Sequence, residues 1–197
     1  MNSPERYKST LSFVDLLFNI LLGFVFLFLI AFLLINPVAK KGDIIVPAEY
    51  IITLSWPEGN DNDFDLWVKD PASNVVSFRQ RESGIMHLDR DDYGLSNDSI
   101  IVDGKVTGIK INQESVTLRG TISGNYLISC HFYLQRDPGP IPVTVEVAKL
   151  NSYSVVYKQT IEFMEQGQQM NYYTFFIDAE GDYSDIRSTT ETAVGLR

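Results

Sequence analysis

The sequence predicts a single N-terminal transmembrane α-helix followed by an all-β antiparallel sandwich of jelly-roll or Greek-key type. The first observation behind this prediction is an almost unbroken apolar run from Leu16 to Ile35. At 1.5 Å per residue this run would span about 30 Å, the thickness of the hydrocarbon core of a bilayer. The second observation is that apolar residues recur at every second position from Glu49 onward, in short segments separated by Gly, Asn, Asp and Pro. This period is typical of half-buried strands.

The 197 residues have room for one ordinary domain and a short appendage. The helical pattern ends at Asn36-Pro37, because proline cannot donate the next helical hydrogen bond. We therefore expect a cytoplasmic tail over 1–10, a transmembrane helix over 11–36, a linker over 37–48, an extracytoplasmic β-sandwich domain over 49–178 and a flexible tail over 179–197.

A secretory signal peptide is the alternative interpretation of the apolar run. The run is longer than a usual signal-peptide core, an acidic residue lies near its start, and Ile35-Asn36-Pro37 lacks a small-residue cleavage site. These three features favour an uncleaved anchor.

Composition excludes several classes of function. The net charge is −9 and the acidic residues lie almost entirely after residue 42, so we expect no nucleic-acid partner. The single cysteine, Cys130, allows no intramolecular disulfide. His87 and His131 lack metal-site spacing, and the chain has neither a nucleophile motif nor a glycine-rich phosphate loop, so we expect no enzyme.

Alternation within single strands indicates which residues form the core. In one expected strand Ile128, Cys130 and Phe132 fall on one face, while Ser129 and His131 fall on the other. About 130 residues with this pattern are enough to close a core between two sheets.

Asp15 is a carboxylate near the start of an otherwise apolar helix, which is costly unless it faces protein, water or an ion path. Asn19 lies one turn further on the same helical face. Alternatively, Asp15 lies at the headgroup level, favoured by the helix N-terminus, with Ser9, Thr10 or Ser12 as the cap. The residues alone leave both interpretations open.

The segment from Ser12 to Leu22 resembles the single membrane helix of the ExbD, TolR and MotB proteins and of the related subunit of Zorya-type defence systems. The resemblance continues to Pro47 and covers about residues 8 to 47. It implies a subunit of a membrane motor driven by protons or sodium ions, with Asp15 carrying the ion and Asn19 and Ser12 assisting.

The same resemblance implies partners and a location. It implies a homodimer of this chain inside a pentameric ring of a MotA-, ExbB- or TolQ-like subunit, in the bacterial inner membrane. The N-terminus would be cytoplasmic, and the periplasmic β-domain would anchor the motor or transmit force, through an envelope component such as peptidoglycan or another glycan.

The β-domain departs from these families, whose corresponding domains have a mixed α/β or α+β fold. What it binds is therefore open. The alternative function is a membrane-tethered ligand-binding or adhesion module without ion transport.

Two acidic stretches, 61–71 and 88–94, resemble a little-characterised bacterial β-sandwich family with aspartates on a strand, an Asp-Pro turn and a second acidic stretch followed by glycine. Carboxylates that converge from a strand and a loop suit calcium, which prefers six to eight oxygen ligands. The expected ligands are Asp63, Asp65, Asp89 and Asp91.

Two other interpretations of these stretches stay open. The acidic residues can be turn and solvent-face residues, since Asp and Asn favour loops for their local hydrogen bonds. Alternatively, Trp67 and Tyr93 form an aromatic surface for a glycan or a peptide. Beyond calcium and the driving ion, no cofactor is expected.

Overall fold

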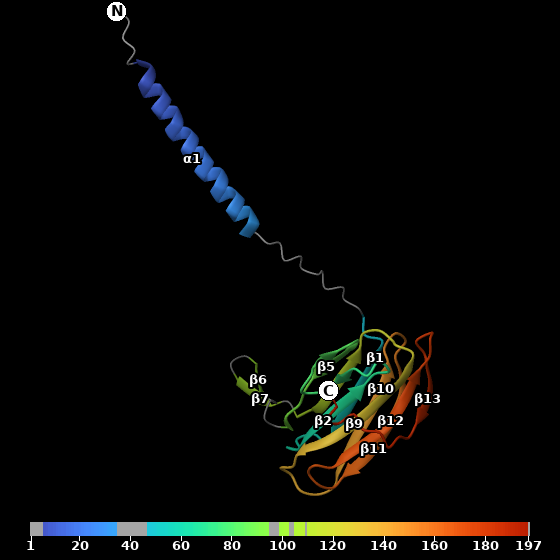
Figure 1. Ribbon diagram of the computed structural model, residues 1–197. Coiled ribbons are helices and arrows are strands. Elements are labelled where there is room, and N and C mark those ends of the chain that lie inside the picture. The colour runs from blue at the N-terminus through green and yellow to red at the C-terminus, as the bar shows by residue number, and fades with distance from the viewer. Residues whose placement is uncertain (1–5, 35–46, 95–98, 103–104, 109, 197) are drawn as a thin grey trace, which may run out of the picture. The chain divides into compact units, whose positions relative to one another are not determined.

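The computed structural model describes residues 6–34, 47–94, 99–102, 105–108 and 110–196 (Figure 1). The chain divides into two compact units, Met1–Ile45 and Val46–Arg197, which are considered separately. Most of the predicted linker, residues 37–46, lies outside the described residues.

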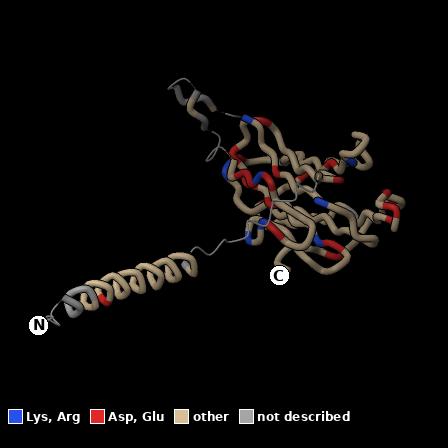
Figure 2. Tube along the Cα trace, turned by 90° about the horizontal axis from the view of Figure 1, so that it is seen from above, with Lys and Arg blue, Asp and Glu red and all other residues tan. Residues whose placement is uncertain are grey.

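The first unit contains one helix, α1 (Arg6–Leu34). Its segment Leu11–Leu33 has a mean hydropathy of 2.9 over 23 residues, which is long and apolar enough to cross a membrane. Asp15 is the single acidic residue of α1 (Figure 2). The helix is apolar around its whole circumference, a distribution that favours a lipid or protein environment over water.

The second unit is a two-sheet antiparallel β-sandwich, which confirms the predicted fold class (Figure 1). The six-stranded sheet has the order β11 (Ser154–Phe163), β10 (Ile141–Lys149), β1 (Tyr50–Trp56), β8 (Asn112–Leu118), β5 (Met86–Arg90) and β4 (Glu82–Ser83). The five-stranded sheet has the order β13 (Tyr183–Arg187), β12 (Gln169–Ile177), β9 (Gly124–Leu134), β2 (Asp63–Lys69) and β3 (Val75–Val76). A separate hairpin joins β6 (Ser99–Val102) to β7 (Lys105–Gly108).

The core lies between the two sheets and follows the predicted alternation. Ile128, Cys130 and Phe132 of β9 are buried in it, as are alternate residues of β1 and β10. Aromatic rings fill the centre, where Phe64 of β2 stacks on Phe132 with 4.3 Å between ring centroids.

The C-terminal segment differs from the predicted flexible tail. It forms β13, which pairs with β12, and it then crosses the outer face of the five-stranded sheet. Ala193 is fully buried there, and its backbone N–H donates a hydrogen bond of 3.0 Å to Ser129 Oγ. It packs in a second apolar cluster with Trp67 and Leu127. The sequence did not predict this packing, because the C-terminal segment is mostly polar and only one small residue of it is fully buried.

Replacing Ala193 with Glu is expected to detach residues 188–196, because a carboxylate cannot enter the second apolar cluster without losing its hydration. We expect a loss of about 1–2 kcal/mol in the free energy of unfolding and faster trypsin cleavage after Arg187. Thr190→Glu places the same charge at an exposed position of the segment and should leave cleavage unchanged. Equal cleavage of both variants would show that Ala193 does not hold the segment.

Candidate functional site

Four buried carboxylates gather where β2 faces β8 and the loop that follows β5. We call them the acidic cluster: Asp63 and Asp65 from β2, Asp91 from the loop and Glu114 from β8. Asp63 and Asp65 are each 4% exposed, Glu114 is 1% exposed and the Asp91 side chain is 4% exposed. The four act on one another electrostatically, since neighbouring carboxylates raise the pKa of Asp63, Asp65 and Glu114.

Glu114 occupies an inward-facing position of β8, where it binds the backbone of β2. It can do so because β2 lacks a complete strand neighbour on this side. The short β3 pairs only with Val68 and Lys69, so the backbone of Leu66 needs another acceptor. Glu114 Oε2 accepts a hydrogen bond of 2.6 Å from Leu66 N. Burial, followed by the charges of Asp65 and Asp91, raises the pKa of Glu114 well above its ordinary value, although the bond from Leu66 opposes this shift.

Asp65 and Asp91 each have a side-chain partner. His131 Nδ1 lies 3.2 Å from Asp65 Oδ2, yet burial still raises the pKa of Asp65. The Tyr93 hydroxyl donates a hydrogen bond of 2.8 Å to Asp91 Oδ2, and Arg81 Nη1 lies 3.9 Å from the same oxygen. These contacts fix both carboxylates at the edge of the cluster.

Asp63 differs from the other three. None of the described residues donates a hydrogen bond to its carboxylate or forms a salt bridge with it. Burial and the charge of Asp65 raise its pKa to about 7, and the positive charge of Arg136 lowers that value only in part. Arg136 Nη1 instead donates to the backbone carbonyl oxygens of Asp61, at 2.8 Å, and Tyr93, at 3.1 Å.

The loop after β5 is held by Asp92 and Gly94. Asp92 accepts hydrogen bonds from Arg90 Nη2, at 2.8 Å, and from the backbone N–H groups of Gln113 and Gly94. Gly94 has φ +68°, and a Cβ atom there would lie 2.7 Å from the carbonyl oxygen of Asp61. Only glycine fits this close approach, which explains why a glycine follows the acidic stretch.

Asp89 lies apart from the predicted metal ligands. The register between β5 and β8 shifts between Leu88 and Arg90, so Asp89 is the extra residue of a β-bulge and the alternation with Asp91 is lost. Asp89 lies at the surface, 2.8 Å from His87 Nδ1 and 3.3 Å from Arg119 Nη2. Of the four predicted ligands, Asp63, Asp65 and Asp91 therefore lie together and Asp89 lies apart from them, while Glu114, which sequence reasoning missed, lies with the three.

The cluster supplies only oxygen atoms and the charge of several carboxylates, a chemistry that suits hard cations. Within the described ranges, no group of three or more His, Cys, Asp or Glu side chains is arranged to hold a metal ion. Binding one cation to several of these carboxylates therefore requires their side chains to turn toward one another.

The predicted aromatic surface does not form as expected. Trp67 is 2% exposed and packs edge-on against Phe78, at 5.9 Å between ring centroids, so it offers no surface to a ligand. Tyr93 is 45% exposed. On β2, Trp67 shares the outer row with Asp63 and Asp65, and the C-terminal segment covers this end of the row.

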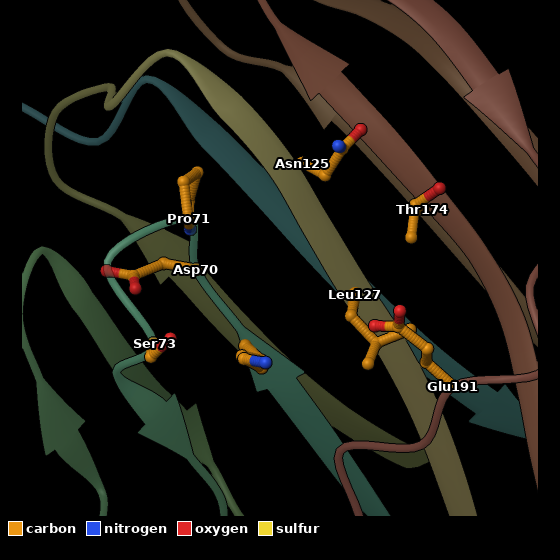
Figure 3. A pocket seen from close by; sticks show the side chains of 8 residues that line it. Asp70, Pro71, Ser73, Asn125, Leu127, Thr174 and Glu191 are labelled. Atoms are coloured by element: carbon orange, nitrogen blue, oxygen red, sulfur yellow. The ribbon is translucent and has the colours of Figure 1, made fainter.

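A polar hollow of about 320 Å³ lies elsewhere on the five-stranded sheet (Figure 3). Asn125 of β9 and Thr174 of β12 lie on its floor, the loop of Asp70 borders it on one side, and Glu191 of the C-terminal segment borders it on another. The Asp70 carboxylate accepts bonds of 2.8 Å from the backbone and side chain of Asn74, so it closes a turn.

The three helix residues singled out in the sequence lie on α1. Asp15, Asn19 and Ser12 are exposed on the helix. Their predicted role in carrying ions depended on the resemblance to motor proteins.

Comparison with solved structures identifies a different set of similar proteins. The chain resembles a homologue of the telluride resistance protein TerD from Streptomyces coelicolor A3(2), with 15% sequence identity, a TM-score of 0.44 and coverage of 75% of this chain and 94% of that one. It also resembles SAV2460, a protein of unknown function, with 15% identity, a TM-score of 0.45 and coverage of 74% and 92%. A likeness of this strength carries no information on function. No protein-family model and no curated protein matches the chain.

These findings correct the prediction of a motor subunit. One similar structure is a homologue of TerD and the other is a protein of unknown function; neither is an ExbD, TolR, MotB or Zorya protein, and no family model matches the chain. The resemblance of residues 8–47 to those families was therefore wrong, and so was the prediction of an ion-driven motor or a proton channel that depended on it.

The shifted pKa of Asp63 predicts a pH dependence of stability. Asp63 holds its proton up to about pH 7 in the folded chain but has an ordinary value of 3.8, so the folded state binds more protons between these values. Stability should therefore fall as the pH rises from 5 to 8, by roughly 2–3 kcal/mol from this residue. Urea unfolding followed by tryptophan fluorescence measures this loss, because Trp56 and Trp67 are both buried in the β-domain.

Asp63→Asn should be more stable than the unsubstituted chain at pH 8 and nearly equal to it at pH 5, in buffer with EDTA. Asp89→Asn removes a carboxylate outside the cluster and serves as the control. If the free energy of unfolding of Asp63→Asn depends on pH as that of the unsubstituted chain does, Asp63 is not the group responsible.

Proposed function

We propose that this chain is a membrane-tethered binding module, without ion transport, whose β-sandwich takes up a hard divalent cation such as calcium at the acidic cluster. Helix α1 is the tether, in the bacterial inner membrane, with the N-terminus in the cytoplasm and the β-domain outside. Asp15 is then a residue at the headgroup level near the start of the helix, where a carboxylate is favoured.

The observation that carries this proposal is the Asp63 carboxylate, which is 4% exposed and receives no hydrogen bond from the described residues. Burying a carboxylate without a partner is costly, and the other three carboxylates increase that cost. A cation bound among them would offset both effects.

The surroundings support a hard cation. The carboxylates come from three segments of the chain, and oxygen ligands from separate segments are what calcium sites use. The Arg136 guanidinium already lies at the rim, on the carbonyl oxygens of Asp61 and Tyr93, so this part of the domain stabilises positive charge. Extracellular modules bind calcium with dissociation constants on the order of 10⁻⁴–10⁻³ M, which sets the concentration range for a titration.

Isothermal titration of the full-length chain in detergent micelles with CaCl₂ tests the proposal. We expect saturable binding, and we expect Asp63→Asn and Asp91→Asn each to weaken it about tenfold or more, because each removes a charged ligand. The same titration with MgCl₂ should give weaker binding, since Mg²⁺ demands a stricter octahedral geometry.

Asp89→Asn is the matched control, because Asp89 is close in sequence to Asp91 but lies on the surface with His87 and Arg119. It should bind calcium as the unsubstituted chain does. Absence of calcium binding up to 10 mM, a concentration about tenfold above the weakest extracellular modules, would refute the proposal, as would equal losses in the Asp63 and Asp89 variants.

A further inference from the structure

Strand β11 is the most prominent edge of the sandwich. The four strands at the sheet edges are β11, β4, β13 and β3, and they contain 10, 2, 5 and 2 residues. In the part of the chain that the structure describes, β10 is the neighbour of β11 and no strand lies along its outer side (Figure 1). A long edge strand presents backbone N–H and C=O groups on which another strand can pair.

The regular part of β11 has a defined centre. Its register with β10 is unbroken from Tyr157 to Phe163, and it shifts beside Val156, the unpaired residue of a β-bulge. A bulge bends and twists a strand, so it limits straight pairing at that end. The regular segment therefore contains seven residues, with Thr160 in the middle.

The side chains of this segment are self-complementary about Thr160. In an antiparallel pair of two identical segments centred there, Lys158 lies opposite Glu162 of the second copy, and the symmetry repeats this pair. On the solvent face, Lys158 Nζ lies 2.9 Å from Glu146 Oε2 and Thr160 Oγ1 lies 2.8 Å from Thr144 Oγ1.

The opposite face of the segment is also compatible with pairing. Tyr157 would lie opposite Phe163, and Gln159 opposite Ile161, on the face that packs against the core. Opposing aromatic rings on neighbouring strands stabilise a sheet. The apolar inner layer would therefore continue across the junction.

Other registers lack this complementarity. A shift of one residue places Thr160 opposite Ile161, which faces the core, and so mismatches the two faces. Centring the pair on Gln159 places Lys158 opposite Thr160, and centring it on Ile161 places Glu162 opposite Thr160. Both of these registers remove the two charge pairs.

We infer that β11 is a homodimerisation edge, on which a second copy of this chain pairs antiparallel with Thr160 opposite Thr160, joining two six-stranded sheets into one. The partner is a second copy because Lys158 of one copy meets Glu162 of the other when two such strands pair. This pairing is centred on Thr160, so it uses the whole segment that the bulge leaves regular. Tethering two copies to one membrane would raise their effective concentration and favour this pairing. The inference does not depend on cation binding.

Cysteine cross-linking of the full-length chain in membranes tests the register. In Thr160→Cys the two substituted positions would be directly opposite, with Cα atoms about 4.5–5.5 Å apart, which is within the range of a disulfide. We expect a disulfide-linked dimer on a non-reducing gel. Ser154→Cys is the matched control, since Ser154 is an exposed residue of the same strand outside the regular segment and would lie far from its counterpart in the second copy, and the native Cys130 is buried. Absence of a Thr160→Cys dimer, or equal cross-linking of both variants, would overturn the inference.

Charge reversal tests the partner chemistry in sedimentation measurements on the full-length chain in micelles. Glu162→Lys and Lys158→Glu should each weaken self-association about tenfold, because both symmetric pairs become repulsive. An equimolar mixture of the two variants should associate again, as each copy then meets opposite charges. Glu180→Lys makes the same charge change in an exposed turn and should have no effect.

Two results would overturn the inference here. One is a wild-type chain that stays monomeric over the whole concentration range. The other is a dimer that both charge variants leave intact, which would place the contact elsewhere, for example on α1. Urea unfolding of each variant establishes that it is folded.

Discussion

Burial of the inward-facing apolar side chains between the two sheets holds the β-domain together and determines where its polar residues lie. Phe64 and Leu66 of β2 pack into this core, so the residues between and before them, Asp63 and Asp65, are directed to the other face of the strand. On β8 the same constraint places Glu114 inside, where its carboxylate is stabilised by the backbone of Leu66. The acidic cluster is thus a consequence of how β2 is inserted between its neighbours.

The sandwich itself could be predicted from the sequence because alternation of apolar residues depends only on the strand and its two faces. It identified the buried face of β9 and the faces of β2 correctly. Features that depend on pairing between distant segments were not accessible. The bulge at Asp89 arises from the register of β5 with β8, and the buried position of Ala193 arises from contact with Ser129. Neither the strand register nor this long-range contact can be predicted from the local alternation of apolar and polar residues.

The candidate site shows the same division. Asp63, Asp65 and Asp91 could be selected from the sequence because acidic residues are conspicuous among strand residues. Glu114 could not, because a single carboxylate in a strand of mixed composition has no pattern of its own. Trp67 was assigned to a surface because its neighbours are acidic, yet β2 is buried on both faces and the side chain lies under the C-terminal segment.

Helix α1 shows why a short apolar motif is weak evidence of ancestry. Many helices that cross a bilayer share Leu, Phe, Ile and Val in the same proportions, since the hydrocarbon core selects for them. A single aspartate near the start of such a helix adds little, because the helix N-terminus stabilises a carboxylate without any further function.

Because β2 is buried on both faces, its sequence can vary during evolution only in certain ways. One row of this seven-residue strand is part of the core, and the other contains two carboxylates of the acidic cluster. An insertion or deletion of one residue would exchange the two rows, placing carboxylates in the core and aromatic rings in the cluster. Relatives that keep the fold should therefore vary by substitution within β2 and by length only in the loops beside it.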